Sequence, residues 1–308
     1  MISYDGLFNL LKAKGLSKTA FANKVGISSR TLAKLSNGDY VAMKVIEDIC
    51  RTLSCTPGDI LSISDGPTAL SKLLSVLREE KDMKLKGGLY HQTQIEMTYN
   101  SNHIEGSRLT KDQTRYIFET NTIGLEADES ANVDDIIETV NHFACFDYML
   151  AHSSEQLSEN MIKEFHRILK TGTSDARKDW FRVGEYKARP NVVGDAKTAA
   201  PGRVAEEMGK LLSAYNRKNP ISFEDIVEFH HRFESIHPFQ DGNGRVGRII
   251  MFRECLVNGI LPFIIGHEHK MFYYRGLKEF NREKGYLMDT CRAAQDEYEK
   301  LAAYFNIP

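Results

Sequence analysis

Apolar residues recur every three or four positions through most of the chain, and this period predicts a mainly helical protein. The period is clearest over residues 133–151, 158–169 and 222–236. Ser222 can cap the last of these helices, because two acidic residues follow it in the first turn. An apolar stripe along the same helix, from Ile226 to Ile236, predicts that it packs into the core.

One stretch departs from the helical pattern. Residues 180–201 mix alternating and β-branched side chains around Arg189-Pro190-Asn191, which predicts a two-stranded hairpin. Helical periodicity resumes at about Arg203 and continues to the end of the chain. The pattern therefore predicts a mainly α fold with one small β-hairpin.

The N-terminal part has its own pattern of short helices. Ser17 can cap a helix that ends at Gly26, and Ser28 or Ser29 can cap a second one that ends at Asn37-Gly38. Five apolar residues can form a small core: Leu16, Phe21, Val25, Ile27 and Leu32. Two short helices around a tight glycine turn are typical of a helix-turn-helix.

Charge supports a separate role for this N-terminal part. Residues 6–38 contain six basic residues and no acidic one, although residues 1–65 as a whole carry a net charge of only +2. A basic face of this kind favours a nucleic-acid partner. A small helical interaction domain with a solvated basic face is the alternative. Ser64-Asp65-Gly66-Pro67 follows as the expected linker.

Composition sets broad limits on the whole chain. Its 308 residues, 42% of them hydrophobic, are enough for one large domain and one small one. The sequence contains no run of eighteen apolar residues, so it predicts no membrane span, and the start of the chain lacks the pattern of a signal peptide. Five cysteines without a C-x-x-C pair argue against a disulfide framework. We therefore expect a cytoplasmic protein without a membrane partner.

The stretch HPFQDGNGRVGR, residues 237–248, carries the clearest chemistry. Pro238 ends the preceding helix, and a new helix begins after Gly244. The first turn of that helix exposes unpaired N–H groups and the positive end of its dipole, so it favours an anion. Gly242 and Gly244 allow the backbone to approach such a ligand closely.

Charged residues around this helix start indicate which anion binds. Arg245 and Arg248 lie one turn apart and oppose the dipole, which indicates a multiply charged anion such as a polyphosphate. Asp241 in the same loop is suited to Mg²⁺, and His237 is suited to accept a proton near pH 7. Together these residues predict a nucleotide–Mg²⁺ site with a general base.

Two other nucleotide motifs and a zinc site are less consistent with the sequence. GNGRVG, residues 242–247, matches the dinucleotide pattern, but it follows a helix and a proline instead of a strand. No G-x-x-x-x-G-K-[ST] and no H-E-x-x-H occurs. His230 lies on the apolar stripe, where we expect a core histidine, and we expect His231 at the surface.

HPFQDGNGRVGR also matches every fixed position of the motif H-x-F-x-[DE]-G-N-G-R-x-x-R, so the chain resembles the Fic family over about residues 90–300. That resemblance implies a mainly helical Fic fold with a small β-hairpin flap. It also implies transfer of AMP from ATP to a Ser, Thr or Tyr hydroxyl of a target protein or of the chain itself, with release of pyrophosphate.

The resemblance implies a role for each motif residue. His237 would deprotonate the target hydroxyl, and Phe239 would point into the core. Asp241 would hold Mg²⁺. The remaining residues would bind the nucleotide: Gly242, Asn243 and Gly244 as an anion cradle with Asn243 at the α-phosphate, Arg245 at the β-phosphate and Arg248 at the γ-phosphate.

Two further groups of residues follow from the same resemblance. The hairpin would be the flap that clamps the target as an added strand. Its core spans Tyr186 to Gly194, with Val192 and Val193 between them. Three residues after the motif would border the adenine: Tyr273, Tyr274 and Asn281. The alternative for these three is a buried aromatic pair and a surface asparagine.

The N-terminal stretch LSKTAFANKVGISSRTLAKLSNG resembles the small helix-turn-helix domains of the Cro/C1 class. This resemblance implies a DNA operator as partner and the following DNA-facing residues: Ser28, Ser29, Arg30 and Lys34. We therefore expect three parts: a helix-turn-helix domain over 1–65, a linker or helix over 66–89 and a Fic domain over 90–308.

SNHIEG, residues 101–106, matches [ST]-x-x-x-E-[GN], the pattern of the inhibitory helix in many Fic proteins. The resemblance implies an inhibitory helix over about 95–106, in which Glu105 pairs with Arg248 and takes the arginine that the γ-phosphate needs. Ser101 opens the motif. We expect the two charged groups to touch, about 2.7–2.9 Å apart. A surface glutamate near a helix end is the alternative.

Several functions remain open at this stage. Some relatives use the same glutamate to remove AMP, and a few family members use other phosphate-containing donors. A transcription regulator whose Fic domain only senses nucleotide is the alternative function, although it would not need His237 as a base. A toxin paired with an antitoxin is a third possibility. The helix-turn-helix and the subgroup resemblance both favour a homodimer.

Overall fold

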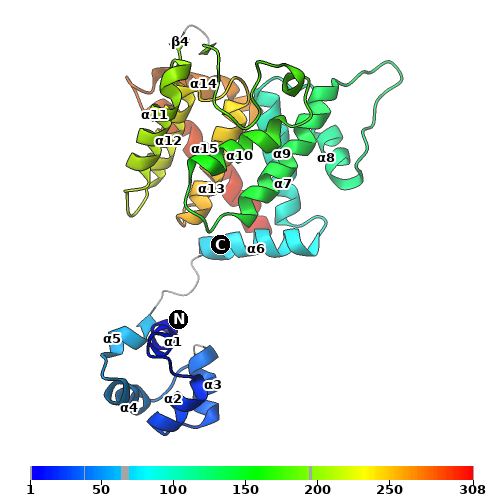
Figure 1. Cartoon of the computed structure of the whole chain (residues 1–308). Helices are drawn as coiled ribbons and strands as arrows, with labels where there is room; N and C mark the ends of the chain where they lie inside the picture. Colours follow the sequence, from blue (N-terminus) through cyan, green and yellow to red (C-terminus); the bar gives the residue numbers. More distant parts are fainter. Residues whose placement is uncertain (1, 38, 64–68, 194–195, 308) are drawn as a thin grey trace. The chain divides into compact units, whose positions relative to one another are not determined.

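The computed structural model describes residues 2–37, 39–63, 69–193 and 196–307. The chain divides into two compact units, Met1–Thr68 and Ala69–Pro308, which are described separately (Figure 1). The expected linker, Ser64-Asp65-Gly66-Pro67, lies outside the described residues.

The first unit is a small helical domain closed by one pair of strands. Its elements are β1 (Ile2–Ser3), α1 (Asp5–Ala13), α2 (Lys18–Val25), α3 (Ser29–Asn37), α4 (Met43–Leu53), α5 (Pro57–Ile60) and β2 (Ser62–Ile63). Strands β1 and β2 pair antiparallel. The sequence pattern did not predict this pair, because each strand has only two residues.

Local capping explains the two central helices of this unit. Ser17 Oγ accepts a hydrogen bond from Ala20 N at 3.2 Å, and Gly26 ends α2 in the left-handed conformation with φ of 81°. Phe21 is fully buried, and the other four expected core residues pack against the same cluster. The predicted helix from Ser17 to Gly26 is therefore confirmed.

The second unit is mainly helical (Figure 1). Its first elements are α6 (Ala69–Met83), α7 (Leu89–Ile104), α8 (Lys111–Thr120), α9 (Val133–Ala151), α10 (Glu159–Lys170) and η1 (Asp175–Arg177). Then follow β3 (Val192–Val193), β4 (Ala196–Lys197), η2 (Pro201–Arg203), α11 (Val204–Tyr215), α12 (Phe223–Ile236), α13 (Asn243–Val257), η3 (His267–His269), α14 (Lys270–Glu279) and α15 (Gly285–Tyr304).

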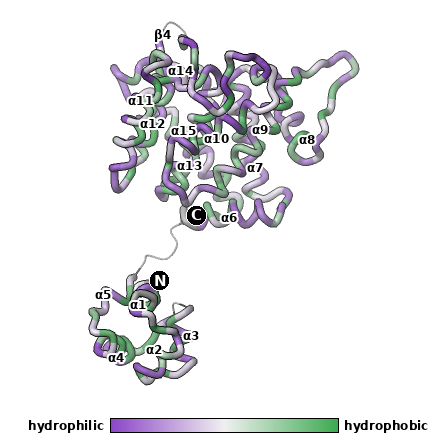
Figure 2. The backbone as a smooth tube through the Cα atoms, in the orientation of Figure 1, coloured by the Kyte–Doolittle hydropathy of each residue, from purple (hydrophilic) through white to green (hydrophobic). Residues whose placement is uncertain are grey.

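Helix α13 lies at the centre of this unit. It contacts α6, α7, α9, α10 and α12, and every residue from Asn243 to Leu256 is buried. Figure 2 shows hydrophobic and polar positions interleaved along the surrounding helices, each of which turns an apolar face inward. The N-terminal turn of α13 is therefore held by several elements that are distant in sequence.

Helix α12 forms as its sequence predicts. Ser222 and Asp225 form a capping box at its start. The expected apolar stripe is buried, including His230. The expectation for His231 was wrong: it is buried and stacks on Phe280 at 4.2 Å between ring centroids. Phe280, at the end of α14, covers His231, which the pattern of α12 places on its polar side.

The predicted hairpin is much shorter than the stretch 180–201. Strands β3 and β4 have two residues each and pair antiparallel, Val192 with Lys197. Gly194, which the sequence places in the flap, lies outside the described residues. Residues 180–191 and 198–200 follow an irregular path, so the flap as a target clamp stays a prediction. Among the described residues, none of the helices has the length and apolar character needed to cross a membrane.

Candidate functional site

The loop between α12 and α13, residues 237–242, brings the chemistry-bearing residues to one helix end. His237 ends α12 with φ of 51°, a left-handed conformation that is unusual for a residue with a side chain. Gly242, with φ of 80°, turns the chain into α13. We call residues 237–242 the catalytic loop.

His237 is largely buried and uncharged at neutral pH. Burial, and then the positive charge of Lys187, lower the pKa of His237 to about 4. Its Nδ1 lies 3.9 Å from an oxygen of Glu234, too far for a hydrogen bond. An uncharged imidazole can accept a proton, so the residue suits a general base.

Asn243 holds the catalytic loop in shape. Its Oδ1 accepts from Phe239 N at 2.8 Å, and its Nδ2 donates to Phe239 O at 2.9 Å. Phe239 itself is fully buried and stacks on His166, with ring centroids 4.0 Å apart. The Asn243 side chain is therefore engaged with the loop backbone, and an anion here would meet the α13 backbone N–H groups.

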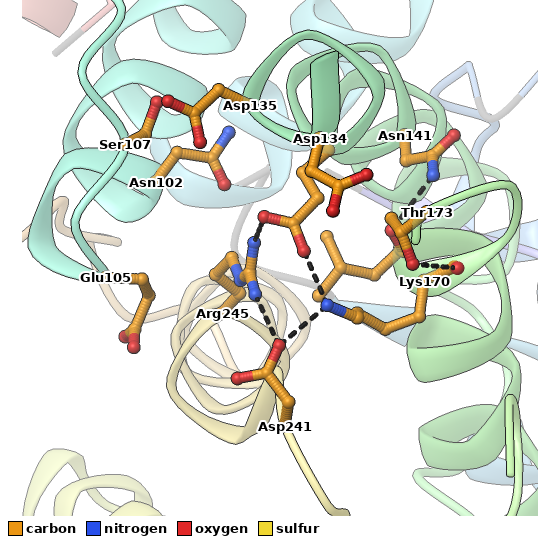
Figure 3. A network of polar contacts seen from close by, with 12 residues as sticks. Asn102, Glu105, Ser107, Asp134, Asp135, Asn141, Lys170, Thr173, Asp241 and Arg245 are labelled. Carbon is orange, nitrogen blue, oxygen red and sulfur yellow. Dashed lines mark hydrogen bonds and ion pairs between the residues drawn. The ribbon is translucent and has the colours of Figure 1, made fainter. Parts of the chain in front are cut away.

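Asp241 and Arg245 belong to a buried cluster of charges (Figure 3). Arg245 donates to Asp241 Oδ2 at 3.1 Å and also to Glu138. Lys170 donates to the same Asp241 oxygen at 2.7 Å and to Glu138 at 2.6 Å. Burial works against ionisation of Asp241, but Arg245 and Lys170 lower its pKa to about 2.

Lys170 and Glu138 were not predicted from the sequence. Lys170 is the last residue of α10 and Glu138 lies within α9, about 100 residues before the motif. The neighbouring sequence does not reveal that either residue is buried, because a charged residue on the polar side of a helical pattern is expected to face water. Burial of the lysine and its ion pairs become visible only when α9, α10 and α13 pack together.

Arg248 is held by the end of α7. Its Nη2 donates to Glu105 Oε1 at 2.7 Å and to the Ser101 carbonyl at 2.9 Å, and its Nε donates to Ser101 Oγ at 3.0 Å. The contact expected between Glu105 and Arg248 is therefore present. Burial acts to lower the pKa of Arg248, but the Glu105 carboxylate outweighs it and holds that pKa above its usual value.

The Glu105 carboxylate also lies against the first turn of α13. A Cβ atom added to Gly244 would collide with Glu105 Oε1 and would lie 2.8 Å from Arg248 Nη1. A side chain at this position would therefore displace Glu105 or Arg248 from its place in the structure. Arg248 Nη1 is buried and has no hydrogen-bond partner among the described residues. It is a donor available to an anion at this helix end.

The three expected adenine residues lie in different environments. Tyr273 is buried, and its hydroxyl lies 2.7 Å from His230 Nε2, so it packs in the core. Tyr274 is partly exposed and donates to the Ile104 carbonyl at 3.3 Å, next to the end of α7. Asn281 is exposed beyond α14. Both tyrosines lie near the site, because the Arg248 guanidinium lies 5.8 Å from the centroid of the Tyr273 ring and Tyr274 contacts the end of α7.

Of the expected flap residues, Tyr186 lies beside the catalytic loop. Tyr186 packs on Phe239 with ring centroids 5.7 Å apart, and Asn191 Nδ2 donates to Phe239 O at 3.1 Å. Val192 is exposed, as an edge that accepts a strand would need. Val193 pairs with Ala196 in the hairpin.

The four expected DNA-facing residues lie together on α3 and at its start. Ser28 Oγ accepts from Thr31 N at 3.1 Å and so caps the helix. Ser29, Arg30 and Lys34 are exposed on α3. The surface matches the helix-turn-helix expectation in shape and charge, while the DNA contact stays a prediction.

The residues fit a Mg²⁺ ion that is shared with phosphates. Both cationic contacts to Asp241 go to Oδ2, and the side chain is 47% exposed. The second carboxylate oxygen can therefore reach an ion while the first keeps its ion pairs. Mg²⁺ commonly uses one or two carboxylates together with substrate phosphates and water.

Comparison with protein families and curated proteins agrees with this geometry. Residues 156–255 match the Fic/DOC family, and residues 7–66 match the Cro/C1-type HTH DNA-binding domain. The chain is 27% identical over 261 residues to a protein named protein adenylyltransferase Fic from Nematostella vectensis, covering 75% of this chain and 57% of that protein. A protein of the same name from Drosophila willistoni is 30% identical over 59% of this chain and 36% of its own length. The chain thus spans between about a third and just over half of these relatives.

Solved structures show the same fold. A Fic-domain-containing signaling protein from Bacteroides thetaiotaomicron is 26% identical, with a TM-score of 0.56 over 77% of this chain and 91% of that one. A Fic family protein from Desulfovibrio desulfuricans is 22% identical, with a TM-score of 0.57 over 79% of this chain and 76% of that one.

Proposed function

The chain contains a Fic/DOC-family domain behind a Cro/C1-type helix-turn-helix domain, and on this basis we propose that it is a self-inhibited protein adenylyltransferase. It transfers AMP from ATP to a hydroxyl side chain of a target protein or of itself and releases pyrophosphate. The first domain binds a DNA operator.

Support comes above all from the arrangement at the first turn of α13. Arg248 Nη1 is an unpaired buried donor beside Gly244, and His237 and Asp241 flank the same turn. A triphosphate bound there meets backbone N–H groups, the helix dipole and two arginines. These groups stabilise the charge that develops on the α-phosphate and on the leaving pyrophosphate.

Each residue has one role in the transfer. His237 takes the proton from the target hydroxyl, whose oxygen attacks the α-phosphorus as the bond to the β-phosphate oxygen breaks. Arg245 binds the β-phosphate and Arg248 the γ-phosphate. Asp241 would hold Mg²⁺, which when bound neutralises the phosphates and orients them. The flap holds the target segment so that its hydroxyl reaches His237.

Self-inhibition follows from the contact between Glu105 and Arg248. The carboxylate takes the guanidinium donor at 2.7 Å and lies against Gly244, where the γ-phosphate of a productively bound ATP would come. Two anions cannot share this position, since like charges repel strongly at such a buried site. ATP then binds in an unproductive way until the end of α7 moves aside.

Radiolabelled ATP tests this function directly. The full chain is incubated with Mg²⁺ and ATP labelled at the α-phosphate, and self-labelling is followed by gel and mass spectrometry. We expect Glu105→Gly to raise labelling at least about tenfold, because loss of a charge-assisted hydrogen bond worth ~1.5–3 kcal/mol frees Arg248. His237→Ala in the same background should abolish labelling.

Glu126→Gly is the matched control, because Glu126 lies exposed in the loop between α8 and α9. It should label like the wild type. Equal labelling by the wild type, Glu105→Gly and the double variant would refute the proposal. ATP-dependent operator binding without any AMP transfer by Glu105→Gly would instead support a nucleotide-sensing regulator.

A further inference from the structure

Lys187 is a buried lysine of the flap, next to Tyr186. It is only 4% exposed, and its Nζ donates to Asn191 Oδ1 and Thr198 Oγ1, both at 2.7 Å. A third bond goes from Nζ to the carbonyl of Ile236 at 3.2 Å. All three donor positions of the ammonium are used. One side chain therefore joins both sides of the hairpin to the last residue of α12.

The backbone of Lys187 makes a second link to the catalytic loop. Its N–H donates to the carbonyl of Pro238 at 2.8 Å. Ile236 and Pro238 are the two neighbours of His237, so Lys187 binds the carbonyl group on each side of that residue. The left-handed backbone of His237 is unfavourable for a residue with a side chain. Such a conformation persists where its surroundings hold it, and Lys187 is a large part of those surroundings.

Neighbouring contacts make the flap and the catalytic loop one connected unit. Asn191 donates to Phe239 O at 3.1 Å, and Ala199 N donates to Ile236 O at 3.3 Å. Thr198 Oγ1 lies 2.6 Å from Asn191 Oδ1, so the two flap ligands of the ammonium also contact each other. A displacement of the hairpin is therefore transmitted to the backbone around the catalytic histidine.

The charge of Lys187 also acts on His237. Burial lowers the pKa of Lys187 to about 8, with Glu207 on α11 opposing this shift, so the side chain is mostly charged at pH 7. After burial, that positive charge is the largest influence lowering the pKa of His237. The backbone of Glu234 on α12 acts in the opposite sense, as do the negative charges of Glu105 at the end of α7 and Asp241 in the loop.

We propose that Lys187 is a positioning residue that couples seating of the flap to the placement of His237. The idea rests on the proposed function in one respect, the use of His237 as the base. A flap that is seated on its target keeps the ammonium against Ile236, and the imidazole stays aimed at the bound hydroxyl. A displaced flap releases the contact with Ile236 and, with it, the position of the imidazole.

An NMR titration tests the link without any enzyme assay. The imidazole signals of His237 are assigned from their absence in His237→Ala, and the full chain is titrated as wild type, Lys187→Met and Lys187→Gln. Removing a nearby like charge should raise the pKa of His237 by about one unit in both variants. Lys210→Met is the control, because Lys210 is exposed on α11, and it should leave that pKa unchanged.

Labelling rates separate positioning from charge. In the Glu105→Gly background, Lys187→Met should lower kcat roughly 100-fold, the typical effect of a catalytic group displaced by about 1 Å, with KM for ATP unchanged. Lys187→Gln keeps a donor for the Ile236 carbonyl and should recover part of kcat while its pH profile stays shifted.

Two outcomes would overturn the assignment: an unchanged pKa of His237 in Lys187→Met, or a loss that appears only in KM for ATP. Absence of labelling in the Glu105→Gly parent itself would refute the proposed function. The NMR titration would then still decide whether Lys187 acts on His237.

Discussion

Replacing Lys170 by methionine tests the buried cluster of charges beside the catalytic loop. Its Nζ lies 2.6 Å from Glu138, 3.0 Å from Asp175 and 2.7 Å from Asp241, and its side chain is 2% exposed. Methionine keeps most of the apolar stem and removes the charge. Three carboxylates then lose their buried ammonium, and two of them, Glu138 and Asp241, keep Arg245 as a partner.

The size of the effect follows from the exposure of the partners. Breaking a buried ion pair by removing one partner costs about 3–5 kcal/mol. We expect the lower end, about 3 kcal/mol, because Asp241 is 47% exposed and water can reach its carboxylate. For a domain of this size that lowers Tm by about 6–12 °C.

Differential scanning calorimetry at pH 7 measures this change in the transition of the larger unit. Lys178→Met is the matched control, since Lys178 also contacts Asp175, at 2.6 Å, but is 45% exposed. An exposed pair contributes about 0–1 kcal/mol, so its Tm should fall by no more than about 4 °C. Equal Tm values for the two variants would refute the view that burial makes the Lys170 cluster stabilising.

Two further predictions concern pH and DNA. Burial, and then the charge of Glu105, raise the pKa of Glu234 to about 8. The folded chain therefore keeps a proton that the unfolded chain loses as pH rises. The free energy of unfolding falls between about pH 4 and about pH 8 as a result. Glu234→Gln removes that loss, and urea unfolding should show a stability gain over the wild type that grows between pH 5 and pH 8; a constant gap would contradict this. Arg30→Ala and Lys34→Ala should each weaken binding to a DNA duplex and reduce the salt slope by about one, measured by fluorescence anisotropy; an unchanged slope would argue against phosphate contacts.

Features that depend on neighbours within about four residues could be predicted from the sequence. The helix Val133–Ala151 has the predicted bounds, and Ser222 caps α12 as expected, because apolar period and capping are local. The residues of the catalytic loop were also found, since His237 and Asp241 are close in the chain. Glu105 and Arg248 were paired through a family resemblance and could not have been paired by local pattern, because they lie 143 residues apart.

Tertiary structure alone decided which charged side chains are buried and what they contact. Lys170 and Lys187 look like ordinary polar residues in the sequence, and each becomes buried only because distant helices or the flap close over it. His231, which was expected at the surface, likewise lies in the core. A buried cation must find partners when it leaves water, and those partners lie wherever the packed helices bring them. The sequence determined the helices and the catalytic loop by itself, whereas packing decided the environment that sets their charge.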